Sequence, residues 1–258
     1  MKENTLELSV IMPALDEQDN IVLAVKNALS AFDESTVNGE VIVINDGSRD
    51  KTEERVTALI DKDKRIRIIT HDKPQGIGAS FWDGLDNAHG GVVVLLPGDN
   101  EVDPWEILRY FKLLEHVDIV IPFVFNKQVR SLFRNGLSFI YRFIINTTFL
   151  VNFNYTNGTI LYRKSILKEL EFRSTGFFFQ TDILVRIVKK GYLFAEVPYR
   201  LGIRRVGISK AVSFPSLFKV MWGYLRLVKD FYFTRSIKEN KVFHADSKTA
   251  ARKQDYRP

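Results

Sequence analysis

Three carboxylates stand close together after an apolar run near the middle of the chain. The run VVVLL reaches a Pro-Gly pair, and Asp99, Glu101 and Asp103 then fall within five positions. Carboxylate oxygens are the ligands that Mg2+ and Mn2+ prefer, and such a cation usually takes one or two of them, with phosphate and water completing its shell. The alternative is an acidic turn. Asp103 stands just before Pro104 and is better placed to cap a helix over 104–116.

The elements that position this turn alternate between strand and helix. Short apolar runs indicate strands at 6–14, 40–46, 65–70 and 91–96, and the segments between them have the pattern of helices, at 16–32, 48–63 and 76–90. This alternation is typical of a mostly parallel α/β sheet flanked by helices. Ligands of such sheets bind at the carboxyl ends of the strands. The turns PALDE, NDGS and PGDNEVD follow the first, second and fourth strands, so we expect them to meet in one crevice.

Composition sets outer bounds on the function. The chain has 258 residues, 45% of them hydrophobic, which predicts one catalytic domain over 1–235 and a polar, disordered tail over 236–258. A net charge of +6 favours anionic partners. The absence of cysteine excludes a disulfide, a thiolate zinc site and a cysteine nucleophile. The N-terminus lacks the apolar core of a secretory signal, so a cytoplasmic location is expected.

Two amphipathic segments, 127–151 and 214–235, follow the alternating part of the chain. Arg130, Arg134 and Ser138 recur at a spacing of four, which predicts one stripe on a continuous helix beside a broad apolar surface. Such helices suit the interface of a membrane, and neither segment is apolar enough to cross one. The alternatives are a hairpin packed on the core and a dimer interface. Because the basic residues accompany apolar helices, a nucleic-acid partner is not expected.

Six segments, taken in order, resemble a known family. SVIMPALDEQDNI, VIVINDGSRDKT, KPQGIGASFWDGL and the acidic turn are similar to the successive motifs of family 2 glycosyltransferases of the GT-A fold. NGTILYRKSIL and the segment from GFFFQTDILV to GIRRVGISK resemble the acceptor half of the dolichyl-phosphate mannose synthase branch. The resemblance runs from about residue 7 to about residue 230. It implies a peripheral enzyme at the cytoplasmic face of a membrane, and it leaves a homo-oligomer open.

The resemblance implies a binding site for a GDP- or UDP-linked sugar. The residues at the matching positions are Pro13, Leu15, Glu17, Asn45, Asp46, Gly76, Gly78, Gly98, Asp99 and Arg204. Other interpretations of these residues stay open. Asp16 could cap the first helix, residues 45–48 could form an ordinary Asx turn, and Gly76 and Gly78 could allow tight packing of helix on sheet instead of binding an anion.

The acidic turn corresponds to the family's Asp-x-Asp motif, in which two carboxylates hold Mg2+ or Mn2+ against the diphosphate. Pro97 stands in place of the first Asp. Asp99 keeps the second position, and Glu101 stands where the mannose synthase branch has a metal-binding Gln, so the implied metal ligands are Asp99 and Glu101. The alternative is a weakened or lost metal site.

For the acceptor, the resemblance implies a polyprenyl phosphate and transfer with inversion. Arg130, Arg134, Ser138, Arg205 and Lys210 are the acceptor-phosphate candidates, because arginine matches the geometry of phosphate. Asp182 and Asp99 are the catalytic candidates. Asp182 would act as general base for a hydroxyl acceptor, whereas a phosphate acceptor needs none and Asp182 would then orient the site. A transferase for glycan hydroxyls and a non-catalytic nucleotide-sugar-binding protein are the alternatives.

Overall fold

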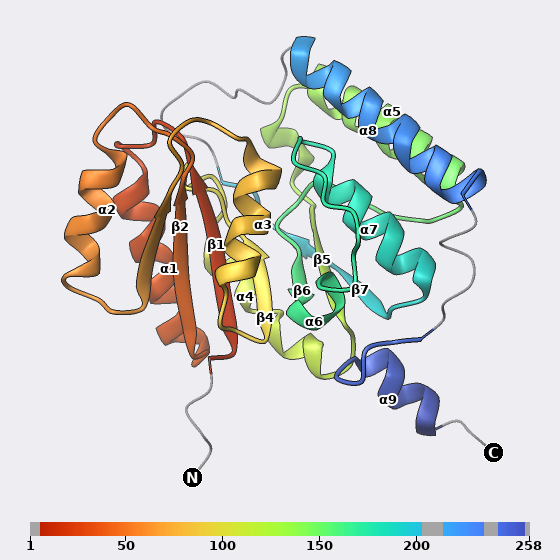
Figure 1. Cartoon of the computed structure of the whole chain (residues 1–258), viewed down its shortest axis with the longest axis horizontal. Helices are drawn as coiled ribbons and strands as arrows, with labels where there is room; N and C mark the ends of the chain where they lie inside the picture. The colour runs from red at the N-terminus through yellow and green to blue at the C-terminus, as the bar shows by residue number, and fades with distance from the viewer. Residues whose placement is uncertain (1–5, 203–213, 235–241, 256–258) are drawn as a thin grey trace.

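A seven-stranded sheet forms the centre of the protein (Figure 1). The computed structural model describes residues 6–202, 214–234 and 242–255. The strands are β1 (Leu8–Ala14), β2 (Gly39–Asn45), β3 (Ile66–Thr70), β4 (Val92–Leu95), β5 (Ile119–Val124), β6 (Leu161–Arg163) and β7 (Phe194–Tyr199), in the order β3-β2-β1-β4-β6-β5-β7. Only β6 runs antiparallel to its neighbours β4 and β5. The prediction of a mostly parallel α/β sheet is confirmed.

Helices cover both faces of the sheet. The helices α1 (Ile21–Ser35), α2 (Thr52–Ile60) and α4 (Pro104–Leu108) pack into one buried cluster, and α3 (Ile77–Asn87), α5 (Leu132–Phe149), α6 (Lys164–Leu167), α7 (Phe179–Lys190) and α8 (Phe214–Tyr232) pack into the other. Successive residues of β1 alternate between them: Val10 and Met12 join the first cluster, and Ile11 joins the second. This is the period of two that a strand imposes. Two 3-10 turns, η1 (Phe111–Glu115) and η2 (Lys127–Val129), flank β5.

The helices α5 and α8 lie side by side (Figure 1). The Thr148 Oγ1 lies 2.8 Å from the Tyr224 hydroxyl, and the ring centroids of Phe149 and Phe231 are 5.5 Å apart. The outward side of the pair exposes large apolar side chains. They are Leu132, Phe133, Leu137, Phe139, Ile140, Phe143 and Ile144 of α5, with Phe218, Met221, Trp222, Leu225 and Tyr232 of α8. Among the described residues, no helix combines the length and hydropathy needed to span a bilayer.

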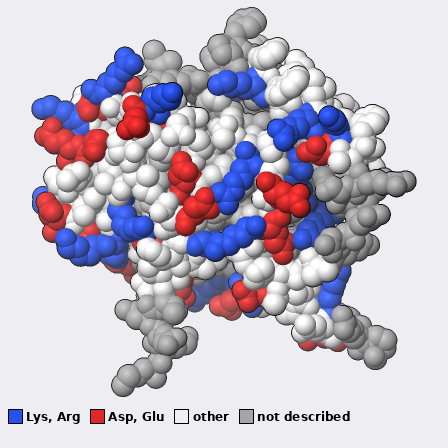
Figure 2. Space-filling view, viewed as in Figure 1, with Lys and Arg blue, Asp and Glu red and all other residues white. Residues whose placement is uncertain are grey.

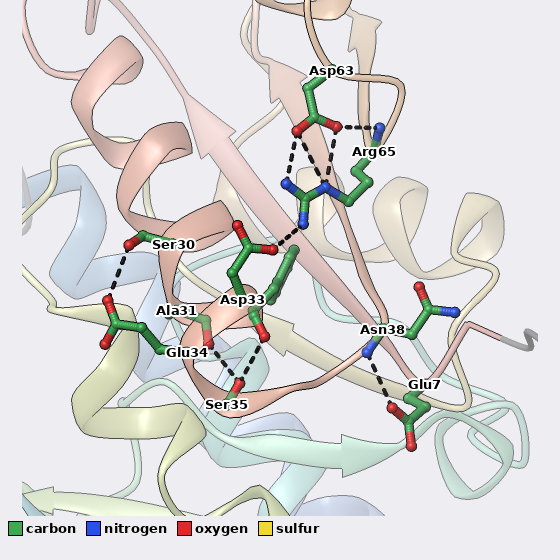
Figure 3. Close-up of polar contacts among 10 residues, drawn as sticks. Glu7, Ser30, Ala31, Asp33, Glu34, Ser35, Asn38, Asp63 and Arg65 are labelled. Carbon is green, nitrogen blue, oxygen red and sulfur yellow. Dashed lines mark hydrogen bonds and ion pairs between the residues drawn. The ribbon is translucent and has the colours of Figure 1, made fainter.

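Ion pairs on the surface join elements away from the carboxyl ends of the strands. Arg65, just before β3, donates from Nη2 to Asp63 at 2.8 Å and from Nη1 to Asp33 of α1 at 2.6 Å (Figure 3). The hydrogen bond with Asp63, followed by that with Asp33, raises the pKa of Arg65. Figure 2 shows basic and acidic side chains interspersed over one face of the molecule, so the net positive charge is not gathered into a single stripe there.

Part of the chain beyond residue 235 is folded. The helix α9 (Lys248–Asp255) begins against Asp118, a fully buried residue just before β5. The Asp118 carboxylate accepts hydrogen bonds from the Lys248 amide at 2.6 Å and the Thr249 amide at 3.0 Å. The expectation of a disordered tail is therefore wrong for residues 242–255. The polar composition of the tail gives no sign of this contact, because the contact depends on one buried carboxylate, that of Asp118.

We expect Asp118→Ala to lower the free energy of unfolding by about 3 kcal/mol, because it removes the N-terminal partner of α9 and the ion-pair partner of Arg163, whose Nε lies 3.2 Å from Asp118. Urea unfolding measures the change. Asp61→Asn, at an exposed position after α2, is the matched control and should stay within about 0.5 kcal/mol of the parent. Equal stability of the Asp118 variant and the control would contradict this role.

Candidate active site

The turns after β1, β2 and β4 meet at one edge of the sheet, as the sequence predicts. The Gly98 amide donates to the Pro13 carbonyl at 2.9 Å, and the Asp46 amide donates to the Ala14 carbonyl at 2.8 Å. These bonds continue the parallel ladders of β1 beyond the ends of its neighbours. A Cβ at Gly98 would lie 2.8 Å from the Ile21 side chain, so only glycine fits there without a shift. The residues on these three turns that are predicted to bind the sugar donor therefore lie at one edge of the sheet.

Side chains lock the first turn to the second. The Asp16 amide donates to the Ser48 hydroxyl at 3.0 Å, and the Glu17 amide donates to the Thr52 hydroxyl at 2.9 Å. Asp50 accepts from the Gln18 amide at 3.0 Å. Burial acts to raise the pKa of Asp50, but hydrogen bonds from Thr52 and the amides outweigh it and lower that pKa. The helix α1 begins at Ile21 with Asn20 as its N-cap, so Asp16 does not cap it.

Asp46 organises the loop after β3. It is buried, and its Oδ1 accepts from the Gln75 amide at 2.8 Å while its Oδ2 accepts from the Gly76 amide at 2.9 Å. The buried ring of His71 lies between two carboxylates, with Nδ1 2.8 Å from Asp46 and Nε2 2.9 Å from Asp83 of α3. The sequence analysis did not select His71. Its position in the sequence could have indicated a role, because His71 directly follows the third strand at the same edge of the sheet.

The glycines near α3 take packing roles in this structure. The Gly76 amide donates to Asp46, and the Gly78 amide donates to the Thr175 carbonyl at 3.1 Å. A Cβ at Gly78 would lie 2.5 Å from the backbone of Thr175. Both amides that were candidates for an anion thus have protein acceptors, which favours the packing interpretation. Asn45 likewise forms the Asx turn, since its Oδ1 accepts from the Ser48 amide at 3.1 Å.

In the acidic turn after β4, the predicted capping role of Asp103 is confirmed, and the assignment of Asp99 and Glu101 as metal ligands stays a prediction. Asp103 accepts from the Trp105 amide at 3.0 Å and caps α4, with Pro104 at the first helical position. Asp99 accepts from the Glu101 amide at 3.1 Å, so the two candidate ligands belong to one tight turn. Within the described ranges, no cluster of three or more His, Cys, Asp or Glu side chains has the arrangement of a metal site. Two carboxylates are nevertheless sufficient for a cation that also binds a diphosphate.

A second group of polar residues lies beside Glu101. Burial, and then the proximity of Tyr155, raises the pKa of Tyr199 at the end of β7; Arg130 lowers that pKa and Glu101 raises it. These effects place Tyr155, Arg130 and Glu101 each within electrostatic range of Tyr199. The Arg130 guanidinium also lies 5.6 Å from the centroid of the Tyr155 ring. Its buried Nε has no hydrogen-bond partner among the described residues.

The predicted stripe of Arg130, Arg134 and Ser138 is wrong at its first member. Arg130 has an extended backbone after η2, and Ser131 caps α5 by accepting from the Arg134 amide at 3.3 Å. The cap starts the helix after Arg130, so only Arg134 and Ser138 lie one turn apart on α5. Arg204, Arg205 and Lys210 lie outside the described residues.

Asp182 is buried in the first turn of α7 and belongs to an ion-pair chain. Its Oδ2 accepts from Arg186 Nε at 3.0 Å, and Arg186 donates to Asp230 of α8 at 2.5 Å. Burial raises the pKa of Asp182 more than the Arg186 contact lowers it. Arg186 thereby connects Asp182, on its own helix, to α8. The role of Asp182, as general base or in orienting the site, stays a prediction.

The family model described as "Glycosyl transferase family 2" matches residues 9–171, which include the three turns, all of β1 except Leu8, and β2 to β6. The chain belongs to glycosyl transferase family 2. Among curated members, the dolichol-phosphate mannosyltransferase of Pyrococcus furiosus is 26% identical over 235 residues, which cover 86% of this chain and 62% of that protein. An uncharacterized glycosyltransferase of Haemophilus influenzae is 33% identical over 112 residues, which cover 43% and 44% of the two chains. The chain thus spans less than two thirds of these relatives.

Solved structures share the fold. Glucosyl-3-phosphoglycerate synthase from Mycobacterium tuberculosis, in complex with Mn2+, UDP-glucose and phosphoglyceric acid, superposes with a TM-score of 0.64 at 21% identity, covering 86% of this chain and 79% of that chain. The same enzyme with Mg2+ and UDP gives a TM-score of 0.65 at 21% identity, with the same coverage. At this level of identity the likeness supports the GT-A fold and leaves the substrates of this family 2 member to its own residues.

We expect Asp46→Asn to loosen the loop after β3, because an amide has one acceptor oxygen where the carboxylate has two. Loss of one buried hydrogen bond should speed exchange of the Gln75 or Gly76 amide about tenfold. Hydrogen exchange measured by NMR follows both amides. Asp72→Asn, an exposed neighbour on the same loop, is the control and should leave them protected. Unchanged protection in the Asp46 variant would show that other contacts hold this loop.

Proposed function

We propose that this family 2 member transfers a sugar from a nucleoside diphosphate sugar to a polyprenyl phosphate at the surface of a membrane, with inversion at the sugar carbon. The observation that carries the proposal is the exposed apolar face of α5 and α8, beside a donor edge formed by three strand ends. A lipid acceptor requires a surface of this kind, whereas a soluble acceptor does not.

The proposed binding of a nucleoside diphosphate sugar is supported by the edge of the sheet where β1, β2 and β4 end. Leu15 and Glu17 follow β1 on a turn that four hydrogen bonds hold against the second turn, so their positions are set before a ligand arrives. A preorganised site does not lose binding energy in ordering its loops. Asp46 contributes by fixing the loop that closes this edge. The Mycobacterium enzyme, whose structure contains UDP-glucose, agrees with a sugar-nucleotide donor.

A divalent cation fits the residues present. Asp99 and Glu101 offer hard oxygen ligands on one turn, and the diphosphate and water would complete the shell of Mg2+ or Mn2+. When bound, the cation would neutralise charge on the leaving diphosphate. Pro97 stands in place of the family's first Asp, and Glu101 would restore the negative charge that this Asp would carry.

The acceptor half is supported by Arg130 and by the ion pairs of α7. The Arg130 guanidinium, whose Nε has no hydrogen-bond partner among the described residues, is a candidate to pair with an acceptor phosphate. A phosphate is already ionised and needs no base. This agrees with Asp182, whose carboxylate is engaged by Arg186, the residue that also pairs with Asp230 of α8.

The charges of α5 and α8 suit an anionic membrane. The two helices carry the cations Arg134, Arg142, Lys219, Arg226 and Lys229 against the single carboxylate Asp230. An apolar face with basic residues on the same helices binds a bilayer through both burial and electrostatic attraction.

Asp99→Asn and Glu101→Gln should each remove most of the Mn2+-dependent part of the thermal stabilisation that the matching nucleoside diphosphate gives, because each removes a charged ligand. The measurement is a thermal-shift panel of UDP, GDP, CDP and dTDP with and without Mn2+. Asp103→Asn is the matched control, since asparagine also caps helices well. An equal loss in the control would contradict the ligand assignment, and no shift with any nucleotide would contradict the donor half altogether.

The double variant Phe133→Gln, Trp222→Gln should weaken binding to phosphatidylglycerol vesicles at least about tenfold, because each exposed side chain would bury apolar area in the bilayer. Vesicle sedimentation measures binding, and sugar transfer to polyprenyl phosphate in the same vesicles should fall with it. Leu23→Gln on α1, which is 49% exposed, is the control and should change neither. Transfer to a soluble glycan hydroxyl, without vesicle binding by the parent chain, would favour the hydroxyl acceptor instead.

A further inference from the structure

A cavity of about 410 Å³ lies at the edge of the sheet opposite the candidate active site. Gly90 and Gly91 line it just before β4 begins, whereas the acidic turn follows the end of β4. Its other walls are the junction of β6 with α6 and the segment before α9. The side chains that line it and carry polar chemistry are His89, Arg163, Lys164, Lys168, His244 and Asp246.

The lining is cationic. Arg163, Lys164 and Lys168 carry positive charge against the single carboxylate Asp246, so the lining is net positive even with both imidazoles neutral. Asp246 lies 3.5 Å from His244 Nδ1, which partly engages it. Burial lowers the pKa of Lys164, and the neighbouring charge of Lys168 lowers it further. Two ammonium groups are thus held close enough to repel each other.

The carboxylates around the cavity are already engaged. Glu40 and Asp86 lie within electrostatic range of Lys164, but Glu40 pairs with Arg67 at 3.0 Å and Asp86 pairs with Arg173 at 2.5 Å.

Asp118 pairs with Arg163 and also caps α9. In the part of the chain that the structure describes, neither Lys164 nor Lys168 forms an ion pair of its own. Two lysines that line a cavity without ion-pair partners suit an anionic ligand.

We propose that this cavity binds a small phosphate-bearing anion from solution, such as inorganic phosphate or a phosphomonoester. Its charge would offset the repulsion between Lys164 and Lys168, and Ser165 could donate a hydrogen bond to it. A lipid headgroup is the other source of the same chemistry. In Figure 1, however, α6 and α9 lie at the opposite end of the molecule from α5 and α8, so a membrane bound by those helices lies away from the cavity. The site is independent of the proposed function.

The first test is calorimetric titration of the full chain with sodium phosphate at fixed ionic strength. Saturable binding with a Kd on the order of 1 mM or tighter is expected, and Lys168→Ala should weaken it about tenfold, because a hydrogen bond to a charged group is lost. Lys62→Ala, an exposed lysine after α2, is the matched control and should bind as the parent does. No saturation up to about 10 mM, or equal weakening by the control, would overturn the proposal.

Two further experiments test where the phosphate binds and whether its source is a solution anion or a lipid headgroup. Phosphate should still bind in the presence of saturating UDP and Mn2+, and competition between them would place phosphate in the donor site and overturn the proposal. Lys168→Ala should leave binding to phosphatidic acid vesicles unchanged. A loss there would make the ligand a lipid headgroup and overturn the assignment to a solution anion. Circular dichroism of Lys168→Ala should match the parent, which separates lost binding from lost folding.

Discussion

The parallel register of β1 with β2 and β4 is the constraint on which the candidate active site depends. Pro13 pairs with Ile44, Ala14 pairs with Asn45, and Ile11 pairs with Leu95, so the chain leaves three strands at nearly the same level. The following turns are then joined by backbone hydrogen bonds. A slip of one residue would move each strand's core side chains to the opposite face, and the buried layers on both sides prevent it. The positions of the turns therefore follow from the core.

This dependence explains how far the sequence could predict the structure. Apolar runs and helical periodicity locate the strands and helices, and the strand ends then bring the turns together without knowledge of any side-chain contact. His71 was missed because its importance comes from Asp46 and Asp83, which are 25 and 12 residues away. The order in the tail was missed for the same reason, since Asp118 lies 130 residues before Lys248. Local sequence patterns do not indicate which residues, far apart in the chain, will contact each other.

The two halves of the molecule are held together differently. The donor half rests on backbone ladders and on turns that bond to one another. The acceptor half rests on side chains that join separate helices: Tyr141 of α5 lies 2.7 Å from the Thr181 hydroxyl of α7, and Arg186 of α7 links Asp182 to Asp230 of α8. Helices joined by side chains can change partners through substitution while the sheet edge stays the same.

The contacts that hold the acidic turn do not depend on a carboxylate at position 97. The turn is fixed by the Gly98 amide on the Pro13 carbonyl and by Asn100, whose left-handed backbone is accompanied by a 2.9 Å hydrogen bond from Asn27 of α1 to its side chain. None of these contacts uses a carboxylate at position 97. The Glu101 amide, in turn, bonds to Oδ1 of Asp99 and so orients that carboxylate. Because the backbone and α1 hold the turn, Pro97 is compatible with the positions of Asp99 and Glu101, the two residues that we propose as metal ligands.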